Sequence, residues 1–119
     1  MFDNQKTFNI VVRHLRKQGK QAIVKDGVGN NCRYRTPEGL KCAAGCLIPD
    51  KKYRPSMEGE ACFSERIANV LIKHNHDPAF VAQLQGIHDN TPVDKWEKDF
   101  VQVATLYNLT VPDKETDHA

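Results

Sequence analysis

Apolar residues in the first part of the chain recur at the three- and four-residue spacing of an amphipathic helix. The residues with this spacing are Phe8, Val11, Val12 and Leu15. They predict a first helix over residues 4–18 with one apolar stripe. Asp3 or Asn4 suits the N-cap position, and Gly19 suits the left-handed position that follows many helices. The sequence therefore marks both ends of this helix.

The second half of the chain shows three more helical patterns in succession, which cover residues 61–74, 78–88 and 92–108. Asp77-Pro78 and Thr91-Pro92 each place a proline, which suits the first helical position, after an N-cap residue. The residues expected on the inner faces are Phe63, Ile67, Val70, Leu71, Phe80, Val81, Leu84, Ile87, His88, Val93, Trp96, Phe100, Val103, Ala104 and Tyr107.

The central stretch has the densest turn chemistry of the chain. Polarity alternates from Cys32 to Arg35, which favours a strand. Thr36 to Gly39 fits a type I turn, with proline in the second position and glycine in the fourth. Residues 40–42 can then return as the partner strand. Because a lone hairpin is marginally stable in water, we expect this one to lie against helices.

Shorter elements are expected on both sides of that hairpin. We interpret residues 21–31 as a loop with a short strand at 22–24. Small residues over 43–48 suggest a short helix, which Pro49 ends because the residue before a proline avoids helical backbone angles. Residues 50–59 are predicted to form a polar loop.

These patterns predict an α+β fold that is mostly helical. Four main helices would pack around a small two-stranded β-hairpin and a short extra helix. We expect one globular domain over residues 1–111, followed by a frayed acidic tail over 112–119. The residues expected in the core include Phe8, Val11, Leu15, Cys42, Leu47, Ile67, Leu71, Leu84, Ile87, Trp96, Phe100 and Val103.

Charge is divided unevenly along the 119 residues, although the net charge is only +2. Residues 1–56 carry twelve Lys/Arg and four Asp/Glu, whereas residues 57–119 carry five and eleven. Such a division allows a basic face for an acidic protein or for nucleic acid, and it equally allows two halves that attract each other. No signal-peptide or membrane-spanning pattern is present, so we expect a cytoplasmic protein with reduced cysteines and no membrane partner.

The four cysteines suggest a zinc site. Thiolates from Cys32, Cys42, Cys46 and Cys62 would supply a tetrahedral set, with His74, His76 and His88 in reserve. Only the Cys42–Cys46 spacing matches a zinc knuckle. Free cysteines are also common core residues, which is the ordinary explanation for Cys46 and Cys62. No other cofactor is expected.

A cysteine hydrolase is a weaker hypothesis. Cys32 or Cys42 would be the nucleophile, His88 the base, and Asp89 or Asn90 the residue that orients the base. The His-Asp-Asn sequence has a simpler explanation, because it lies between two predicted helices and such side chains favour turns. We therefore expect no enzyme activity.

Binding functions fit the basic half of the chain better. The cations that would form one surface are Arg13, Arg16, Lys17, Lys20, Arg33, Arg35, Lys41, Lys51, Lys52 and Arg54, with Tyr34 and Tyr53 between them. Phosphates and acidic proteins both bind such cations. The favoured partner-binding residues are Arg33, Arg35, Lys51, Lys52, Tyr53, Arg54 and Met57, of types that interfaces use. The ordinary alternative is that the aromatic and Met residues only cover the core.

The central stretch also carries a recognisable signature, C-x-Y-R-x3-G-x-K-C-A-x-G-x-L-I-P-D-x2-Y-x3-M-E-G, which runs from Cys32 to Gly59. It resembles a signature of small uncharacterised proteins encoded by bacteriophages and prophages. Residues 84–96, LQGIHDNTPVDKW, resemble a later segment of the same group. The resemblance implies a phage-encoded accessory protein in the host cytoplasm, and it implies no catalytic residues.

We therefore expect a non-enzymatic phage protein that binds a host or host-defence protein and inhibits or redirects it. The alternative is a nucleic-acid-binding protein that uses the basic residues between 13 and 54. A third hypothesis is a small zinc-binding structural domain. A homodimer is left open.

Overall fold

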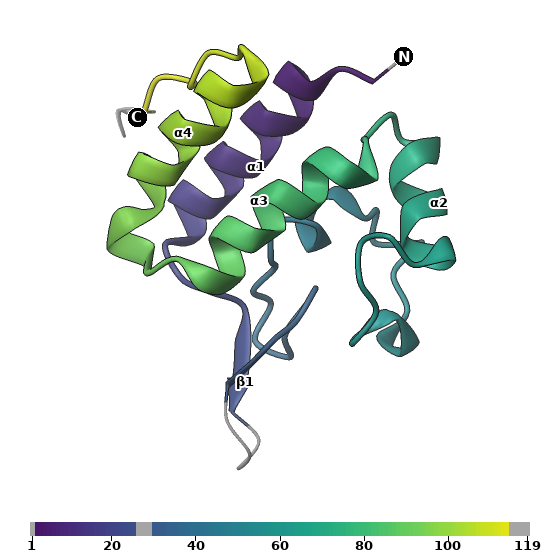
Figure 1. The fold of residues 1–119 in the computed structure, drawn as a ribbon. Helices are drawn as coiled ribbons and strands as arrows, with labels where there is room; N and C mark the ends of the chain where they lie inside the picture. The colour runs from purple at the N-terminus through teal and green to yellow at the C-terminus, as the bar shows by residue number, and fades with distance from the viewer. Residues whose placement is uncertain (1, 26–29, 115–119) are drawn as a thin grey trace, which may run out of the picture.

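Four α-helices account for most of the fold in the part of the chain that the structure, a computed structural model, describes, residues 2–25 and 30–114. They are α1 (Asn4–Gln18), α2 (Glu65–Lys73), α3 (Pro78–Asn90) and α4 (Trp96–Tyr107). Two strands and three single 3₁₀ turns complete it: β1 (Ile23–Lys25), β2 (Asn30–Cys32), η1 (Gly45–Leu47), η2 (Pro55–Met57) and η3 (Val93–Lys95). In Figure 1, α1, α3 and α4 lie side by side, and α2 flanks one end of α3. The expectation of a compact, mostly helical protein is confirmed.

Helix α1 has the bounds that the sequence predicts. The Asp3 carboxylate accepts a hydrogen bond from the Lys6 amide (3.0 Å) and so caps the first turn. Gly19 adopts a left-handed conformation (φ +66°) and its amide donates to the Leu15 carbonyl (2.8 Å). The stripe from Phe8 to Leu15 is fully buried, which explains why its periodicity was a reliable signal.

Aromatic rings join the three central helices. The Phe8 ring of α1 lies 6.4 Å from the Phe80 ring of α3 and 6.4 Å from the Phe100 ring of α4. Phe80 also meets Tyr107 edge to face at 4.7 Å. Edge-to-face packing of this kind contributes about 0.5–1.5 kcal/mol per pair beyond burial. All twelve residues expected in the core are buried.

Two helix starts differ from the prediction. Helix α2 begins at Glu65, four residues later than expected, because Ser64 is its N-cap and accepts a hydrogen bond from the Ile67 amide. Phe63 therefore precedes the helix and is 66% exposed, so its expected place on the inner face of that helix is wrong. Thr91 is not the N-cap of α4: it is the C-cap of α3, its hydroxyl donates to Asp99, and the 3₁₀ turn η3 comes before α4. Val93 in that turn is 36% exposed.

The hairpin expected over residues 32–42 does not form as a pair of strands. The turn forms, with the Gly39 amide donating to the Thr36 carbonyl (2.9 Å), but only one bridge, between Arg35 and Lys41, follows it. The Tyr34 and Arg35 amides donate to the Glu58 carboxylate instead of to a strand.

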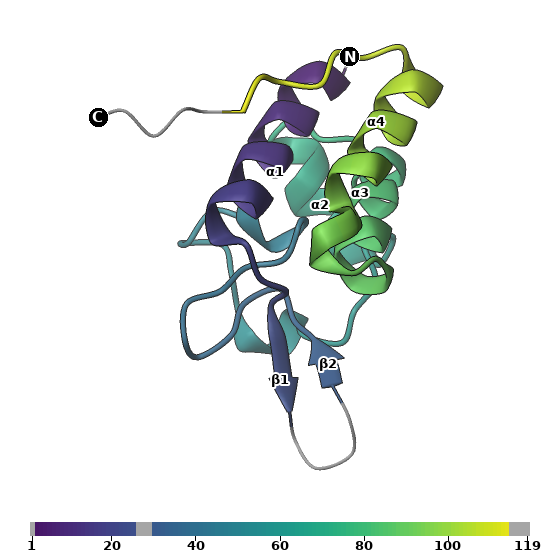
Figure 2. The same cartoon turned by 90° about the vertical axis from the view of Figure 1, so that its left-hand side faces the viewer.

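The two strands that do form pair elsewhere. β1 runs antiparallel to β2, with Ile23 opposite Cys32, so the strand expected at 22–24 is displaced by one residue. Figure 2 shows this pair projecting from the fold beyond the end of α1.

The segment after α4 returns to α1. The Gln5 side-chain amide donates to the Thr110 carbonyl (2.8 Å) and accepts from the Thr110 amide (2.9 Å). Arg16 donates to the Pro112 carbonyl (2.9 Å) and holds the Glu97 carboxylate with two nitrogens (2.8 and 2.7 Å). In Figure 2 this segment crosses the start of α1. The expected tail over 112–119 therefore begins at an anchored residue, and its last five residues lie outside the described part.

Gly45 sits where no side chain fits. A Cβ at this position would lie 1.9 Å from the Tyr34 carbonyl oxygen, which is backbone and cannot rotate away. We predict that Gly45→Ala lowers the free energy of unfolding by more than about 3 kcal/mol, measured by urea denaturation.

The matched control is Gly86→Ala on α3. A Cβ there meets nothing within 4 Å, so this variant should gain up to about 1 kcal/mol from helix propensity. Equal effects of the two variants would contradict the close approach of residues 34 and 45.

Candidate functional site

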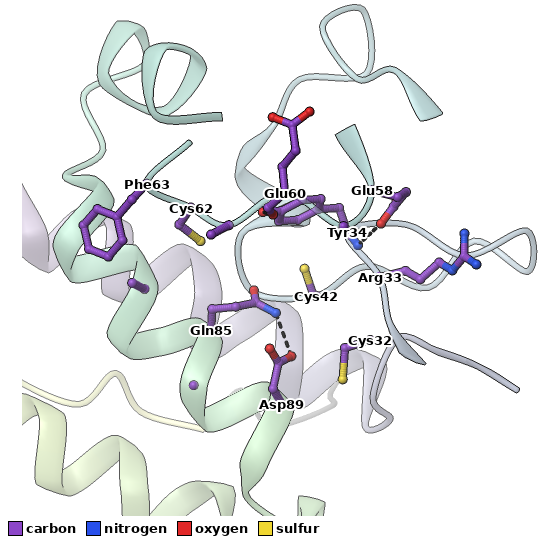
Figure 3. A pocket seen from close by; sticks show the side chains of 14 residues that line it. Cys32, Arg33, Tyr34, Cys42, Glu58, Glu60, Cys62, Phe63, Gln85 and Asp89 are labelled. Carbon is purple, nitrogen blue, oxygen red and sulfur yellow. Dashed lines mark hydrogen bonds between the residues drawn. The ribbon is translucent and has the colours of Figure 1, made fainter. Parts of the chain in front are cut away.

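A pocket of about 470 Å³ opens between the segment before α2 and one side of α3. Its lining residues are Cys32, Arg33, Tyr34, Cys42, Glu58, Gly59, Glu60, Ala61, Cys62, Phe63, Ala82, Gln85, Gly86 and Asp89. Figure 3 shows Asp89 and Gln85 on α3 facing the cysteines. The volume lies within the range of small-molecule sites in proteins. The exposed residues Gly59, Ala61 and Phe63 connect the pocket with solvent.

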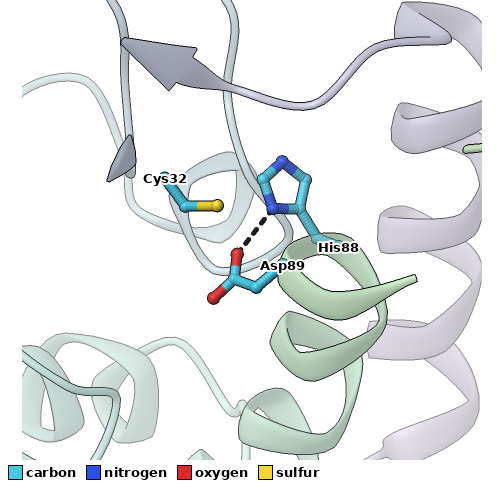
Figure 4. Close-up of side chains that lie close together, drawn as sticks. All are labelled: Cys32, His88 and Asp89. Carbon is cyan, nitrogen blue, oxygen red and sulfur yellow. Dashed lines mark hydrogen bonds and ion pairs between the residues drawn. The ribbon is translucent and has the colours of Figure 1, made fainter. Parts of the chain in front are cut away.

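Asp89 is the centre of a hydrogen-bonded group at this pocket. Its Oδ1 accepts from Gln85 Nε2 (2.8 Å) and from His88 Nδ1 (2.7 Å). Figure 4 shows that Cys32 on β2 lies beside the two residues of α3. Ligand atoms of Cys32, His88 and Asp89 all lie within 4.8 Å of one another. Gln85 also accepts from the Ala44 amide (2.9 Å), which ties this group to the segment before η1.

The protonation of His88 is fixed by its neighbours. The Ala22 amide donates to His88 Nε2 (2.8 Å), so this nitrogen carries a lone pair and the ring proton resides on Nδ1. Nδ1–H then donates to Asp89. The ring is fully buried and stacks on Trp96 at 6.0 Å between centroids. In this state His88 presents no lone pair to Cys32, as a general base would have to.

Burial keeps all four thiols protonated. It raises the pKa of Cys32 to about 11, with the Asp89 carboxylate as a further cause. Burial likewise raises the pKa of Cys62 to about 11 and that of Cys46 to about 12, and it raises the pKa of Cys42 well above its usual value. A nucleophilic cysteine needs the opposite shift, because the thiolate is the reactive form.

The cysteines proposed as zinc ligands do not converge on one point. Cys32, Cys42 and Cys62 line the pocket described above. Cys46 lines a different pocket, which it shares with His74 and His76. Within residues 2–25 and 30–114, Cys32, His88 and Asp89 are the one group of three or more ligand atoms that lie close together. Of the three reserve histidines, only His88 belongs to this group with a cysteine.

The reserve histidines of the second pocket have partners of their own. His74 Nδ1 donates to the Val70 carbonyl (2.9 Å), and His76 Nδ1 is hydrogen-bonded to the Thr7 hydroxyl (2.7 Å). The His74 bond closes the last turn of α2, and the His76 bond joins the segment after α2 to the start of α1.

The loop over residues 49–59 is held by Glu58. Its carboxylate accepts from the amides of Tyr34 (2.9 Å) and Arg35 (3.0 Å) and from the Tyr53 hydroxyl (2.7 Å). Met57, expected to bind a partner, is 3% exposed. Glu58 therefore ties the loop to the backbone at residues 34 and 35.

Arg35 supports the same loop from inside. It donates to the Ile48 carbonyl (2.6 Å), pairs with Asp50 (2.8 Å) and lies over the Tyr53 ring at 4.7 Å. Three residues that the sequence analysis favoured for partner binding, Arg35, Tyr53 and Met57, thus serve the loop itself.

The remaining favoured cations face solvent. Lys51, Lys52 and Arg54 are exposed, and Arg33 is partly exposed close enough to Tyr53 to influence the pKa of its hydroxyl. We call these four residues the basic loop surface. Lys41 lies beside it, since Lys41 and Arg35 share the Asp50 carboxylate. Arg16 belongs elsewhere, because it is paired with Glu97.

Two residues of the site, Gln85 and Glu58, were not predicted by the sequence analysis. Gln85 precedes Asp89 by four residues on one helix, so their shared face was a signal that could have been used. Glu58 gave no such signal, because its amide partners lie more than twenty residues away in the chain.

Removing the charge of Glu58 should loosen the loop. Glu58→Gln places an NH₂ group against backbone amides that need an acceptor, so we predict a loss of about 2 kcal/mol in the free energy of unfolding. Glu38→Gln, at an exposed turn position, is the control and should stay within about 0.5 kcal/mol. Equal midpoints in urea for both variants would show that the Glu58 bonds contribute nothing.

The raised thiol pKa values predict slow alkylation. At pH 8 a pKa of about 11 in place of 9.0 reduces the thiolate fraction about 100-fold, so iodoacetamide should label Cys32 about 100-fold more slowly than in the urea-unfolded chain. Above pH 9 the unfolded chain levels off while the folded rate keeps rising, so this ratio should shrink. A Cys32 that labels as fast when folded as when unfolded would contradict the raised pKa, and faster labelling in the folded chain would indicate an activated nucleophile.

Comparison of the chain with protein-family models, curated proteins and solved structures found no match. In the described part of the chain, no helix has the length and apolar character needed to cross a membrane. Function is therefore inferred from the residues of this chain.

Proposed function

We propose that the chain is a non-enzymatic protein that binds an acidic partner protein through the basic loop surface. The carrying observation is that Glu58 and Arg35 fix the loop from inside while Lys51, Lys52 and Arg54 point to solvent. A loop that is already ordered loses little conformational freedom when it binds, which favours affinity. The cations on it are thus displayed in a fixed arrangement.

The chemistry of the buried group supports a binding function over catalysis. The His88 ring has one nitrogen engaged by the Ala22 amide and the other by Asp89. The neighbouring Cys32 is held as a thiol by burial, which raises its pKa to about 11. Both features favour a structural role for the residues that a cysteine hydrolase would have used.

The positive charge of the basic loop surface supports an acidic protein as the binding partner. Exposed cations on a partner-facing surface accelerate encounter with an acidic partner and suppress other partners. The resemblance to phage proteins suggests which partner to seek, a host or host-defence protein of the infected bacterium. Binding would inhibit or redirect that protein.

Nucleic acid remains the second candidate, because the same cations suit phosphates. The aromatic residues argue against a single-stranded ligand. Tyr34 is buried, with its hydroxyl donating to the Glu60 carbonyl, and the Tyr53 ring is covered by Arg35. Tyr34 is therefore not displayed for stacking on bases, and Tyr53 has one face of its ring occupied by Arg35, whereas proteins that bind single strands usually offer open aromatic rings.

Affinity capture from nuclease-treated bacterial lysate tests the proposal. The tagged chain should retain one acidic host protein at a near-equal molar amount, identified by mass spectrometry. The triple variant Lys51→Glu, Lys52→Glu and Arg54→Glu should weaken the purified complex at least about tenfold, with the loss larger at low salt.

The control carries the same change of charge elsewhere. Lys73→Glu, Lys95→Glu and Lys98→Glu lie at exposed positions on or beside α2 and α4 and should leave the affinity within about twofold. Equal losses for both triple variants would contradict the basic loop surface. Capture that disappears with nuclease, together with salt-dependent binding of mixed-sequence DNA or RNA, would favour the second candidate.

A further inference from the structure

In the part of the chain that the structure describes, Asp89 carries a negative charge at the pocket beside α3 without a positively charged partner. Its Oδ1 accepts from Gln85 and His88, and its side chain is 33% exposed. Gln85 is neutral. His88 is neutral as well, because the Ala22 amide occupies the nitrogen that a second proton would need. A partly buried charge that lacks a counter-charge favours the binding of a cation.

The other charged residues that line this pocket are engaged or directed elsewhere. Glu58 holds two backbone amides of the central stretch, and Glu60 pairs with Arg66. Figure 3 shows the guanidinium of Arg33 directed away from Asp89. Asp89 therefore provides the charge that a ligand inside the pocket would meet.

The wall next to Asp89 consists of small and apolar residues. Ala82 and Gly86 precede it on α3 at four- and three-residue spacing, so the three residues share one face of the helix, and all three line the pocket. A Cβ at Gly86 would meet nothing within 4 Å, which leaves open space above the helix. Phe63 lines the pocket as well and is 66% exposed. An apolar ligand body would therefore find contacts close to the carboxylate.

The groups around Asp89 favour an organic cation over a metal ion. Ligand atoms of Cys32, His88 and Asp89 lie within 4.8 Å of one another. His88, however, directs an N–H at Asp89, and this proton keeps an ion away from that nitrogen. Two ligands remain, which is fewer than a zinc site uses. An organic cation needs one carboxylate, and its apolar part suits the wall of the pocket.

The engaged oxygen of Asp89 selects among organic cations. Oδ1 already accepts two hydrogen bonds, so a ligand would approach Oδ2. A guanidinium binds a carboxylate best through both oxygens, whereas an ammonium is a point charge that one oxygen can hold. We propose that this pocket binds a primary alkylammonium group, with its charge at Asp89 Oδ2 and its alkyl stem on Ala82, Gly86 and Phe63.

Two sources share this chemistry, the lysine side chain of a partner protein and a free small amine. None of the four residues assigned to the site belongs to the basic loop surface. The site therefore goes beyond the function proposed above, and neither depends on the other.

Titration of the intact chain with n-pentylammonium chloride, followed by NMR of the backbone and side-chain amides, tests the site. The signals of the Gln85 side-chain amide and the Gly86 backbone amide should shift together and saturate. We expect a dissociation constant of about 1 mM, since the probe is small. 1-Pentanol, which has the same stem without the charge, should bind at least about tenfold more weakly.

Two variants test the carboxylate and the cavity separately. Asp89→Asn should lower the affinity at least about tenfold, because its amide oxygen can still accept from His88 while its NH₂ group faces the ligand. Gly86→Leu should lower it as much by filling the open space above α3. Asp94→Asn, at an exposed position outside the pocket, is the matched control and should stay within about twofold. Circular dichroism of each variant verifies that it is folded.

Nα-acetyl-lysine methylamide distinguishes the two sources. Binding at least as tight as that of pentylammonium would identify a lysine side chain as the ligand, and binding of pentylammonium alone would identify a free amine. Three results would each overturn the ammonium site: no response to pentylammonium up to ~50 mM, equal binding of 1-pentanol, or unchanged affinity in Asp89→Asn.

Discussion

One backbone amide determines the chemistry of the buried centre. The Ala22 N–H meets the ring of His88 where water is excluded, and it therefore decides which nitrogen of the ring keeps the proton. From that choice follows the direction of the bond to Asp89, whose carboxylate also accepts from Gln85, and Gln85 in turn accepts from the Ala44 amide in the segment before η1. Elements that are distant in sequence are thus joined through a chain of donors and acceptors that has one consistent arrangement.

The loop over residues 49–59 likewise depends on one group that makes several hydrogen bonds, here the charged carboxylate of Glu58. It has little regular secondary structure: backbone turn hydrogen bonds, such as those from the Lys52 and Tyr53 amides to the Pro49 carbonyl, form inside it, and side chains join it to the rest of the fold. Glu58 takes two amides and a hydroxyl, while Arg35 takes a carbonyl and a carboxylate. Charged partners form stronger bonds than neutral ones, which explains how so few residues order an irregular loop. The side chains that can bind a partner are those that do not hold the loop in place, chiefly the exposed Lys51 and Lys52.

Helices and core could be predicted because periodicity reports burial directly. The stripe of α1 and the inner residues of α3 and α4 were recognised for this reason. Phe63 was misplaced because apolarity alone does not show where a helix begins, and the cap at Ser64 decided it. The expected hairpin failed because Glu58, from a distant part of the chain, takes the amides that a ladder would need. The separation of Cys46 from the other cysteines likewise depends on tertiary packing, which spacing does not encode.

The clamp of Gln5 on Thr110 has a consequence for synthesis. Helix α1 is synthesised before α4, and its polar side is completed by α4 and the segment after it, through Gln5 and through Arg16. Its apolar side likewise waits for the rings of α3 and α4. A nascent chain therefore carries α1 with these contacts unmade until α3, α4 and residues 110–112 have been translated. The packing of α1 is therefore completed late, after the contacts within α2 and α3 can already form.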